Sequence, residues 1–372
     1  MRRFRVAIVG TGNIAHAHLD ALRAMGTRVE VVAAVDVDPA RVEAFRAAHD
    51  LSRAYTDTGA MLAAEVPDLV QICTPPAAHA DLSVACLRAG AAVLCEKPLC
   101  GSLAELDRIA AAAAETGRSC STVAQWRFGA GGQHLKGLIA SGALGRPLVG
   151  LCQTTWFRDA AYYAVPWRGT WASELGGTTL GHGIHAIDFF LWQFGDWEEV
   201  SAMLGTFDRA IEVENVSLAI VRFAGGALGS IVNSALSPRQ ESRLRFDFGR
   251  ATVELTHLYR YSNADWRFTP LDSAGGVTGA DASALAARWA ALPPEVPSLH
   301  AAQLAATLDS LERGERPPVG LEEARRTLEF VTALYKSAFT GQPVRRGTIG
   351  PGDPFYARLN GASGAAPIDA AR

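Results

Sequence analysis

VAIVGTGNIA, residues 6–15, governs the architecture: an apolar strand runs into a glycine turn and then into a helix. Gly10 permits the sharp turn, Gly12 lets a pyrophosphate approach the backbone, and Ala15 takes the small position where helix and strand pack. The first N–H groups of such a helix point toward bound phosphates. The pattern predicts dinucleotide binding, with a bare strand–helix turn as the alternative. The predicted contacts of this turn with the cofactor are Gly10, Thr11, Gly12, Asn13 and Ile14.

A second apolar strand, 29–35, ends at Asp36, about where a ribose-binding carboxylate is expected after such a turn. A carboxylate at this place accepts hydrogen bonds from the ribose hydroxyls and repels a 2′-phosphate. Asp36 therefore favours NAD as the cofactor. Arg41 lies close by in the sequence, so NADP stays open as the less favoured cofactor.

The composition excludes several classes of protein. The chain has 372 residues, of which 49% are hydrophobic, enough for two or three domains with cores of their own. A net charge of −3 offers no electrostatic case for binding nucleic acid or an anionic membrane. The basic residues at the start are not followed by the long apolar run of a signal peptide, and no apolar stretch is long enough to span a bilayer. We expect a cytoplasmic protein.

The cysteines indicate neither disulfides nor a metal site. None of the six forms a CxxC pair, and two of them lie in apolar runs, where cysteine behaves as a small hydrophobic residue. We expect reduced thiols, as is usual in the cytoplasm, and no bound metal. The cysteines are Cys73, Cys86, Cys95, Cys100, Cys120 and Cys152.

Strands and helices alternate through the first third of the chain. Such alternation predicts a parallel, doubly wound sheet whose ligands lie at the carboxyl ends of the strands. The predicted strands lie near 5–9, 29–35, 68–73, 91–95 and 120–124, and the predicted helices near 13–25, 39–48, 57–63, 79–89 and 102–116. We therefore predict an α/β dinucleotide-binding domain over residues 1–124. Its further cofactor contacts are predicted at Cys73, Thr74, Pro75, His79, Glu96, Lys97 and Gln125.

The pattern changes after about residue 125, where long strands with alternating polar and apolar residues predict an open, mainly antiparallel sheet. These strands lie at 148–156, 198–206, 215–223, 227–236, 242–248 and 251–257, with hairpin turns at 224–226 and 248–250 and helices near 131–141, 183–193, 297–313 and 320–340. We predict an α+β domain for substrate binding and oligomerisation over 125–344. The tail, 345–372, is rich in Gly, Pro and Ala and is expected to be poorly ordered or to form an arm on a neighbour.

Four segments of the chain resemble the Gfo/Idh/MocA family of oxidoreductases, which includes glucose–fructose oxidoreductase and inositol dehydrogenase. The resemblance extends from Val6 to about Val344. It implies an NAD(P)-dependent dehydrogenase that transfers hydride between the nicotinamide and a carbinol carbon of a sugar, sugar derivative or cyclitol. The segments are Gly10–Ala15, Cys73–Pro76 with His79, Glu96–Pro98, and Gly176–Gly177 through Gly183–Asp188.

Hydride transfer from an alcohol needs a base for the hydroxyl proton and a cation to steady the developing alkoxide. Lys97 follows a buried strand at the ligand edge of the sheet, and His185 begins an apolar helix after a run of glycines. Both match functional positions of the family. Many members carry Asp four residues before that histidine, where this chain has Gly181 followed by His182. The proton acceptor is therefore open. We favour His185 as base, with Lys97 orienting the substrate oxygen.

The segment after the first predicted strand of the second domain is rich in aromatic residues and arginine. Aromatic faces and arginine forks suit polyols and phosphates, and residues 162–171 resemble those of sugar-nucleotide and aldose dehydrogenases in the family. The alternative is an ordinary packed loop. The predicted substrate contacts are Arg127, Trp156, Arg158, Tyr163, Trp167, Arg168, His182 and His185.

Two other functions stay open at this point. The same fold serves in non-catalytic NAD(P)-binding regulators, and an NAD-dependent glycoside hydrolase uses similar chemistry without net turnover of NAD. The resemblance also implies a homodimer or homotetramer, because the open sheet face of the second domain carries apolar residues and needs a partner.

Overall fold

The structure is a computed structural model that describes residues 2–272 and 278–361. The chain divides into two compact units: unit 1 comprises residues 1–123, 172–174 and 300–328, and unit 2 comprises 124–171, 175–299 and 329–372. Within the described residues, every helix is too short or too polar to cross a bilayer. Residues 362–372 of the predicted tail lie outside the described residues.

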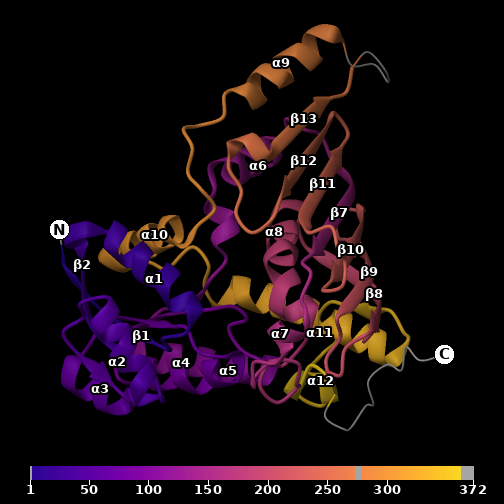
Figure 1. Ribbon diagram of the computed structural model, residues 1–372. Helices are drawn as coiled ribbons and strands as arrows, with labels where there is room; N and C mark the ends of the chain where they lie inside the picture. The colour runs from indigo at the N-terminus through magenta and orange to yellow at the C-terminus, as the bar shows by residue number, and fades with distance from the viewer. Residues whose placement is uncertain (1, 273–277, 362–372) are drawn as a thin grey trace. The chain divides into compact units, whose positions relative to one another are not determined.

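Unit 1 is built on a parallel sheet, as predicted. Its strand order is β3-β2-β1-β4-β5-β6, and all of its pairings are parallel. Figure 1 labels β1 and β2 of this sheet. Central strands of such a sheet are covered on both faces, which explains their unbroken apolar runs. The strands are β1 (Phe4–Val9), β2 (Val29–Val35), β3 (Ala54–Tyr55), β4 (Leu69–Ile72), β5 (Ala92–Cys95) and β6 (Cys120–Thr122).

Three of the crossover helices of unit 1 begin at capping side chains. Asp38 accepts hydrogen bonds from the N–H groups of Ala40 and Arg41, and Ser102 accepts one from Glu105. These caps satisfy N–H groups that have no partner within the helix. The helices are α1 (Asn13–Ala24), α2 (Pro39–Ala48), α3 (Thr58–Glu65), α4 (His79–Arg88) and α5 (Leu103–Thr116).

Helix α10 (His300–Arg313) also belongs to unit 1, although it follows most of unit 2 in the sequence. Its Leu304 and Leu308 are fully buried in the same apolar core as Leu19 of α1. The Gln303 side chain adds a buried hydrogen bond of 2.7 Å to the carbonyl oxygen of Thr122. Helix α10 therefore packs in unit 1, although it follows the strands β7–β13 of unit 2 in the sequence.

Unit 2 is built on the predicted open sheet. Its strand order is β13-β12-β11-β7-β10-β9-β8-β14; β7 and β10 pair in parallel and the other neighbours antiparallel. The predicted hairpin turn after β9 is present, with Gly226 at φ +84°. The strands are β7 (Pro147–Thr155), β8 (Trp197–Gly205), β9 (Val216–Phe223), β10 (Leu228–Ser234), β11 (Glu241–Phe248), β12 (Ala251–His257), β13 (Trp266–Pro270) and β14 (Val344–Arg345).

Helix α8 (Ile184–Phe194) packs on one face of this sheet. Phe190 and Phe194 contact Phe223 and Phe246 with ring centroids 5.1–5.7 Å apart. A Cβ atom at Gly150 would lie 2.5 Å from the Phe190 ring, so β7 must have glycine there. The other helices are α6 (Ala130–Ala140), α7 (Ala160–Tyr163), α9 (Gly279–Ala290), α11 (Leu321–Thr340), which continues from unit 1 into unit 2, and α12 (Pro354–Ala357).

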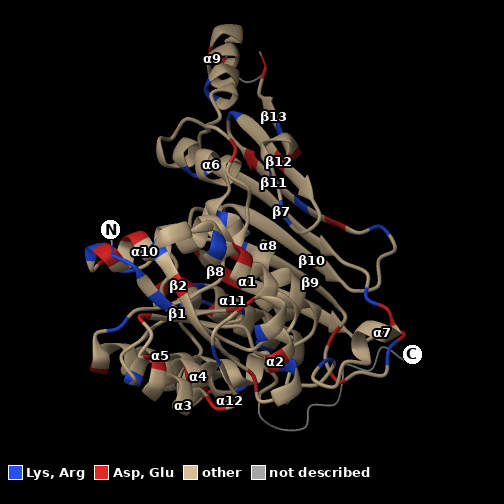
Figure 2. Cartoon of the chain, turned by 60° about the vertical axis from the view of Figure 1, so that its left-hand side comes forward, with Lys and Arg blue, Asp and Glu red and all other residues tan. Residues whose placement is uncertain are grey.

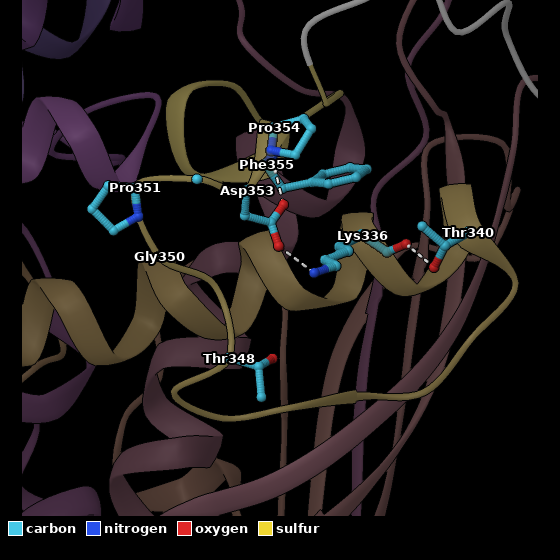
Figure 3. Close-up of a pocket in the computed structure, with 9 residues that line it drawn as sticks. Lys336, Thr340, Thr348, Gly350, Pro351, Asp353, Pro354 and Phe355 are labelled. Carbon is cyan, nitrogen blue, oxygen red and sulfur yellow. Dashed lines mark hydrogen bonds and ion pairs between the residues drawn. The ribbon is translucent and has the colours of Figure 1, made fainter.

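The first part of the predicted tail contains regular structure. β14 pairs with β8, and α12 follows an Asp353 cap. Asp353 also pairs with Lys336 of α11 (Figure 3). The buried Phe355 contacts Phe339. An apolar anchor, several ion pairs and a strand pairing therefore hold this Gly- and Pro-containing segment against unit 2.

Candidate functional site

The glycine turn of unit 1 has the geometry that a dinucleotide needs. Gly10 has φ +92°, and a Cβ atom there would lie 2.7 Å from the backbone of Cys73 and Thr74. At Gly12, in contrast, an added Cβ atom would meet nothing within 4 Å. Gly10 is thus required by the packing of the strands, whereas Gly12 leaves open space before the N-terminus of α1. This turn fits a pyrophosphate, whose charge the helix N-terminus favours.

Asp36 lies at the end of β2, beside the turn. Its Oδ2 accepts hydrogen bonds from the Thr11 backbone at 2.9 Å and the Thr11 hydroxyl at 3.0 Å. Its Oδ1 accepts from the Asp38 backbone at 3.1 Å and from Arg41 at 3.3 Å. Burial opposes ionisation, but these donors outweigh it and lower the pKa of Asp36. The Arg41 side chain is more than half exposed.

The Glu96–Pro98 turn follows β5 directly. Of residues 91–103, Lys97 alone is not buried. The Lys97 N–H donates to Glu96 Oε2 at 3.2 Å. On the other side of the turn, His79 Nδ1 lies 2.7 Å from the carbonyl oxygen of Pro98, and its Nε2 lies 2.8 Å from that of Thr74. His79 therefore links the two segments that follow β4 and β5, and Lys97 is the residue that this turn presents.

A second set of predicted residues surrounds the start of α8 in unit 2. The chain forms one turn of π-helix over Thr179–Gly183 before α8 begins. The sequence predicted only a helix from 183 onward. Single π-turns are rare and are often found at functional sites. Here the turn contains Gly181 and His182 and leads directly to His185.

His182 is held in one tautomer by its neighbours. Its Nε2 lies 3.1 Å from Arg158 Nε and 2.9 Å from the Tyr162 hydroxyl. Because a guanidinium can only donate, His182 Nε2 is an acceptor, and the ring proton is on Nδ1, 3.4 Å from the Thr178 hydroxyl. In this arrangement the basic nitrogen of His182 is already engaged.

His185 lies in an aromatic environment. It stacks on Trp126 at 5.7 Å and contacts Tyr259 edge-on at 5.8 Å and Trp156 at 6.3 Å. The imidazole is buried. Trp126 and Tyr259 were not predicted from the sequence, because no motif marks them and only the fold brings them to α8.

Arg127 is buried, and its guanidinium forms a two-pronged ion pair with Asp188 of α8 at 2.6 and 2.7 Å. Such forks are the strongest geometry of this pair. The pair joins the segment after Gln125 to the helix that carries His185. Gln125 itself lies in unit 2, with Nε2 3.5 Å from the Tyr259 hydroxyl.

The remaining predicted substrate contacts lie near one another in unit 2. The Arg168 guanidinium stacks on the rings of Tyr162 and Trp167, at 3.7 and 4.1 Å, and hydrogen-bonds the Tyr162 hydroxyl. Tyr163 contacts Tyr162 edge-on at 5.0 Å. Through Tyr162 this aromatic cluster is continuous with His182.

Three further polar residues were missed by the sequence analysis. In unit 1, His18 and His300 donate to Glu96, at 2.9 and 3.2 Å. In unit 2, Glu214 accepts hydrogen bonds from the N–H groups of Gly177 and Thr179, at 3.0 and 2.9 Å. A lone histidine on a helix, or a glutamate in a loop, gives no sequence signal, because the partners are far away along the chain.

Comparison with known proteins agrees with this geometry. Residues 4–123 match the model of an oxidoreductase family with an NAD-binding Rossmann fold, and residues 133–254 match the Gfo/Idh/MocA C-terminal domain. D-apiose dehydrogenase from Paraburkholderia graminis is 27% identical over 353 residues, which are 92% of this chain and 90% of that one. Inositol 2-dehydrogenase from Rhodococcus erythropolis is 39% identical over 151 residues, 40% of this chain and 43% of that one.

Among solved structures, WlbA dehydrogenase from Bordetella pertussis, in complex with NADH and UDP-GlcNAcA, is similar to this chain with a TM-score of 0.82 and 26% identity. The similarity covers 94% of this chain and 100% of that one. Both family models, the parallel sheet of unit 1 and the open sheet of unit 2 lead to the same assignment. The chain belongs to the Gfo/Idh/MocA family of NAD-binding oxidoreductases.

Proposed function

We propose that the protein is an NAD-dependent dehydrogenase that oxidises a carbinol carbon of a sugar, sugar derivative or cyclitol. The observation that carries this proposal is Lys97, the one unburied residue in a buried turn beside a glycine loop that fits a pyrophosphate. The relatives support the substrate class, since they act on apiose and inositol and one was solved with a nucleotide sugar.

The cofactor, when bound, supplies the nicotinamide that accepts the hydride. Gly10, Gly12 and the N-terminus of α1 would hold its pyrophosphate, and Asp36 its ribose. The contacts predicted at Cys73, Thr74 and Pro75 follow β4, at the ligand edge of a parallel sheet. Gln125 is the last of the predicted cofactor contacts along the chain.

Lys97 and His185 are proposed as the acid–base pair. Lys97 would orient the substrate oxygen and stabilise the developing alkoxide, and His185 would accept its proton. The engagement of His182 Nε2 by Arg158 supports His185 as the base and His182 as a substrate contact. Further substrate contacts are proposed from the aromatic and basic residues of unit 2: Arg127, Trp156, Arg158, Tyr163, Trp167 and Arg168.

We also propose a homodimer or homotetramer formed through the face of the unit 2 sheet opposite α8. Ile220 of β9 is 66% exposed, and the register aligns it through Ser230 with Leu151 of β7. Leu218 and Met203, 51% and 78% exposed, pair directly in the next row. The strands β7 and β10 carry no charge (Figure 2). An apolar face of this kind is usually an interface, and light scattering at micromolar concentration tests it.

The function is tested by mixing the protein with NAD and a panel of aldoses, nucleotide sugars and inositols, and following NADH absorbance. Accumulation of NADH supports a dehydrogenase. Binding of NAD without NADH indicates a regulator, and hydrolysis of a glycoside without net NADH indicates a glycoside hydrolase. Calorimetric titration with both cofactors tests the preference that Asp36 predicts, and equal or tighter binding of NADP would contradict it. The six buried free cysteines suit a reducing, cytoplasmic location.

A further inference from the structure

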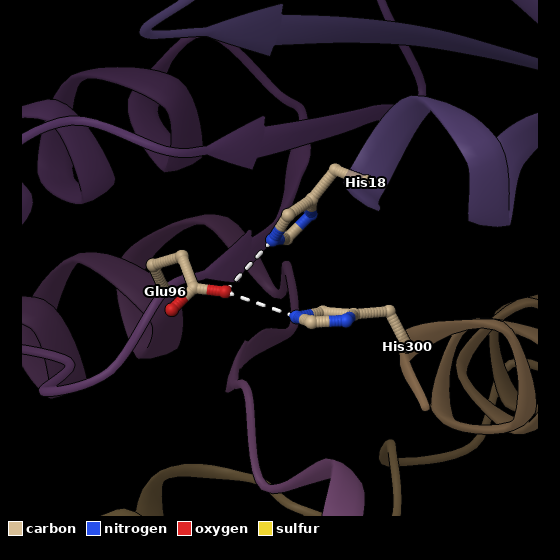
Figure 4. Close-up of side chains that lie close together, drawn as sticks. All are labelled: His18, Glu96 and His300. Atoms are coloured by element: carbon tan, nitrogen blue, oxygen red, sulfur yellow. Dashed lines mark hydrogen bonds and ion pairs between the residues drawn. The ribbon is translucent and has the colours of Figure 1, made fainter. Parts of the chain in front are cut away.

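We propose that His18, Glu96 and His300 form a buried hydrogen-bonded triad that positions Lys97. The inference rests on the catalytic role of Lys97 proposed above. The three side chains come from α1, the end of β5 and the start of α10, all within unit 1. All three are buried, and both imidazoles donate from Nε2 to the same oxygen, Glu96 Oε1 (Figure 4).

The geometry is that of two donors on one acceptor. The N···O distances are 2.9 Å for His18 and 3.2 Å for His300, which are ordinary hydrogen-bond lengths. In a metal site the three lone pairs would instead converge on a common point about 2 Å from each donor atom. Here both ring N–H groups point at Oε1 itself, so the carboxylate is the centre of the cluster.

Both ring nitrogens of His18 are within hydrogen-bond distance of a polar side chain. Its Nδ1 lies 3.0 Å from Gln71 Oε1, so each of its nitrogens faces an oxygen acceptor. Burial opposes the charge, but neighbouring Cys73 and Glu96 raise the pKa of His18 well above its usual value. Hydrogen bonds from the two histidines likewise outweigh burial and hold the pKa of Glu96 well below its usual value. These shifts favour a charged His18 beside an ionised Glu96, and His300 adds a second hydrogen bond to the same carboxylate.

The Glu96 carboxylate connects the two histidines to the Glu96–Pro98 turn. Its second oxygen, Oε2, accepts the backbone N–H of Lys97 at 3.2 Å. The Glu96 N–H bonds the carbonyl oxygen of Ile72 at 2.9 Å, which ties the turn to β4. His79 holds the Pro98 carbonyl on the far side at 2.7 Å. These bonds hold the backbone from which the Lys97 side chain extends, and one of them comes from Glu96, which in turn is bound by a histidine 204 positions later in the chain.

The test compares His300→Leu, which removes a donor to Glu96, with His300→Gln, which keeps an N–H group near the same place. Gln303→Met is the matched control, because it removes a buried hydrogen bond between α10 and β6 without touching Glu96. We expect His300→Leu to lower kcat by about 10- to 100-fold, as for a misplaced catalytic group, with KM for NAD little changed. His300→Gln should restore most of the turnover, and Gln303→Met should keep it.

Hydrogen–deuterium exchange gives a readout that needs no substrate. The Lys97 amide should exchange faster in His300→Leu than in the wild type, and remain protected in Gln303→Met. If the wild type oxidises no substrate, the proposed function fails while this exchange pattern still reports on the triad. Unchanged exchange and turnover in His300→Leu, or an equal loss in Gln303→Met, would overturn the proposal. One equivalent of tightly held divalent metal in the purified wild type would overturn it too, and make the triad a metal site.

Discussion

Two fully buried glutamates, one in each unit, behave in opposite ways. Glu96 is surrounded by two histidines, and their hydrogen bonds lower its pKa in spite of burial. Glu214 is surrounded by neutral donors, the N–H groups of Gly177 and Thr179 and the hydroxyl of Tyr335, and burial raises its pKa. Hydrogen bonds satisfy both carboxylates, but only a cationic partner offsets the full cost of burying the charge.

The opposite pKa shifts of Glu96 and Glu214 indicate that the two glutamates have different roles. His18 and Glu96 lie beside the turn that carries Lys97. A change in this pair is therefore expected to affect the position of Lys97 and, through it, the proposed reaction. Around Glu214, the carboxylate holds the backbone at the start of the π-turn that carries His182. Substitutions around Glu96 are expected to lower both activity and stability. Substitutions around Glu214 are expected to lower mainly the local stability of the loop.

The largest expected effect is on stability. Glu96→Gln leaves the His18 charge buried without its partner and should cost ~3–5 kcal/mol of unfolding free energy. Glu214→Gln removes one acceptor from neutral donors and should cost ~1–3 kcal/mol. Urea unfolding of the two variants measures both values. A greater loss in Glu214→Gln would reverse the comparison.

The second largest expected effect is on activity, which should fall after substitution near Glu96 but not after substitution of Glu214. Lys97→Ala should lower turnover at least ~100-fold, in line with loss of one acid–base or electrostatic group, while NAD still binds. Glu214→Gln should retain turnover within a few-fold of the wild type once both proteins are fully folded. Steady-state kinetics with the best substrate of the panel decides, and near-normal activity of Lys97→Ala would remove it from the mechanism.

Two glycines extend the comparison to backbone contacts. A Cβ atom at Gly177 would lie 1.7 Å from the carbonyl oxygen of Glu214, so Gly177→Ala must displace the loop and should cost ~1–3 kcal/mol. At Gly12 the space is open, so Gly12→Ala should leave the Tm nearly unchanged and weaken NAD binding. Calorimetry of unfolding and of NAD titration measures each effect. A large fall in Tm for Gly12→Ala would show that this turn serves folding first.

The smallest expected effect is on the pH dependence of stability. The folded pKa of Glu96 lies below the ordinary value of 4.5, so its contribution is present above pH 4.5 and is lost as the pH falls through the folded pKa. The folded pKa of Glu214 lies above 4.5, so its contribution rises as the pH falls from that pKa to 4.5. Unfolding of the wild type and of both Gln variants, followed from pH 7 to below pH 3, separates the two contributions. Glu214 should make the wild type more stable as the pH falls toward 4.5, and Glu96 should make it less stable as the pH falls further. The same direction of change in both windows would contradict the assignment.

Much of unit 1 could be predicted because its signals are local. The residues of the glycine turn are neighbours in the sequence, and the strand of Val29–Val35 leads directly to Asp36. The Ala224–Gly226 hairpin was predicted for the same reason, since a tight turn is specified by the residues within it. Short or half-exposed elements, such as β3 and β13, were missed because they lack a strong apolar pattern.

The family, the sheet of each unit, the NAD turn and the position of Lys97 therefore follow from the order of residues along the chain, because a turn or an apolar strand is encoded within a few residues. The fold alone brought His300 to Glu96, Tyr259 to His185 and Arg127 to Asp188. Each of these contacts joins segments that are far apart in sequence, and a buried charge or ring gains its partner only when the core around it has closed.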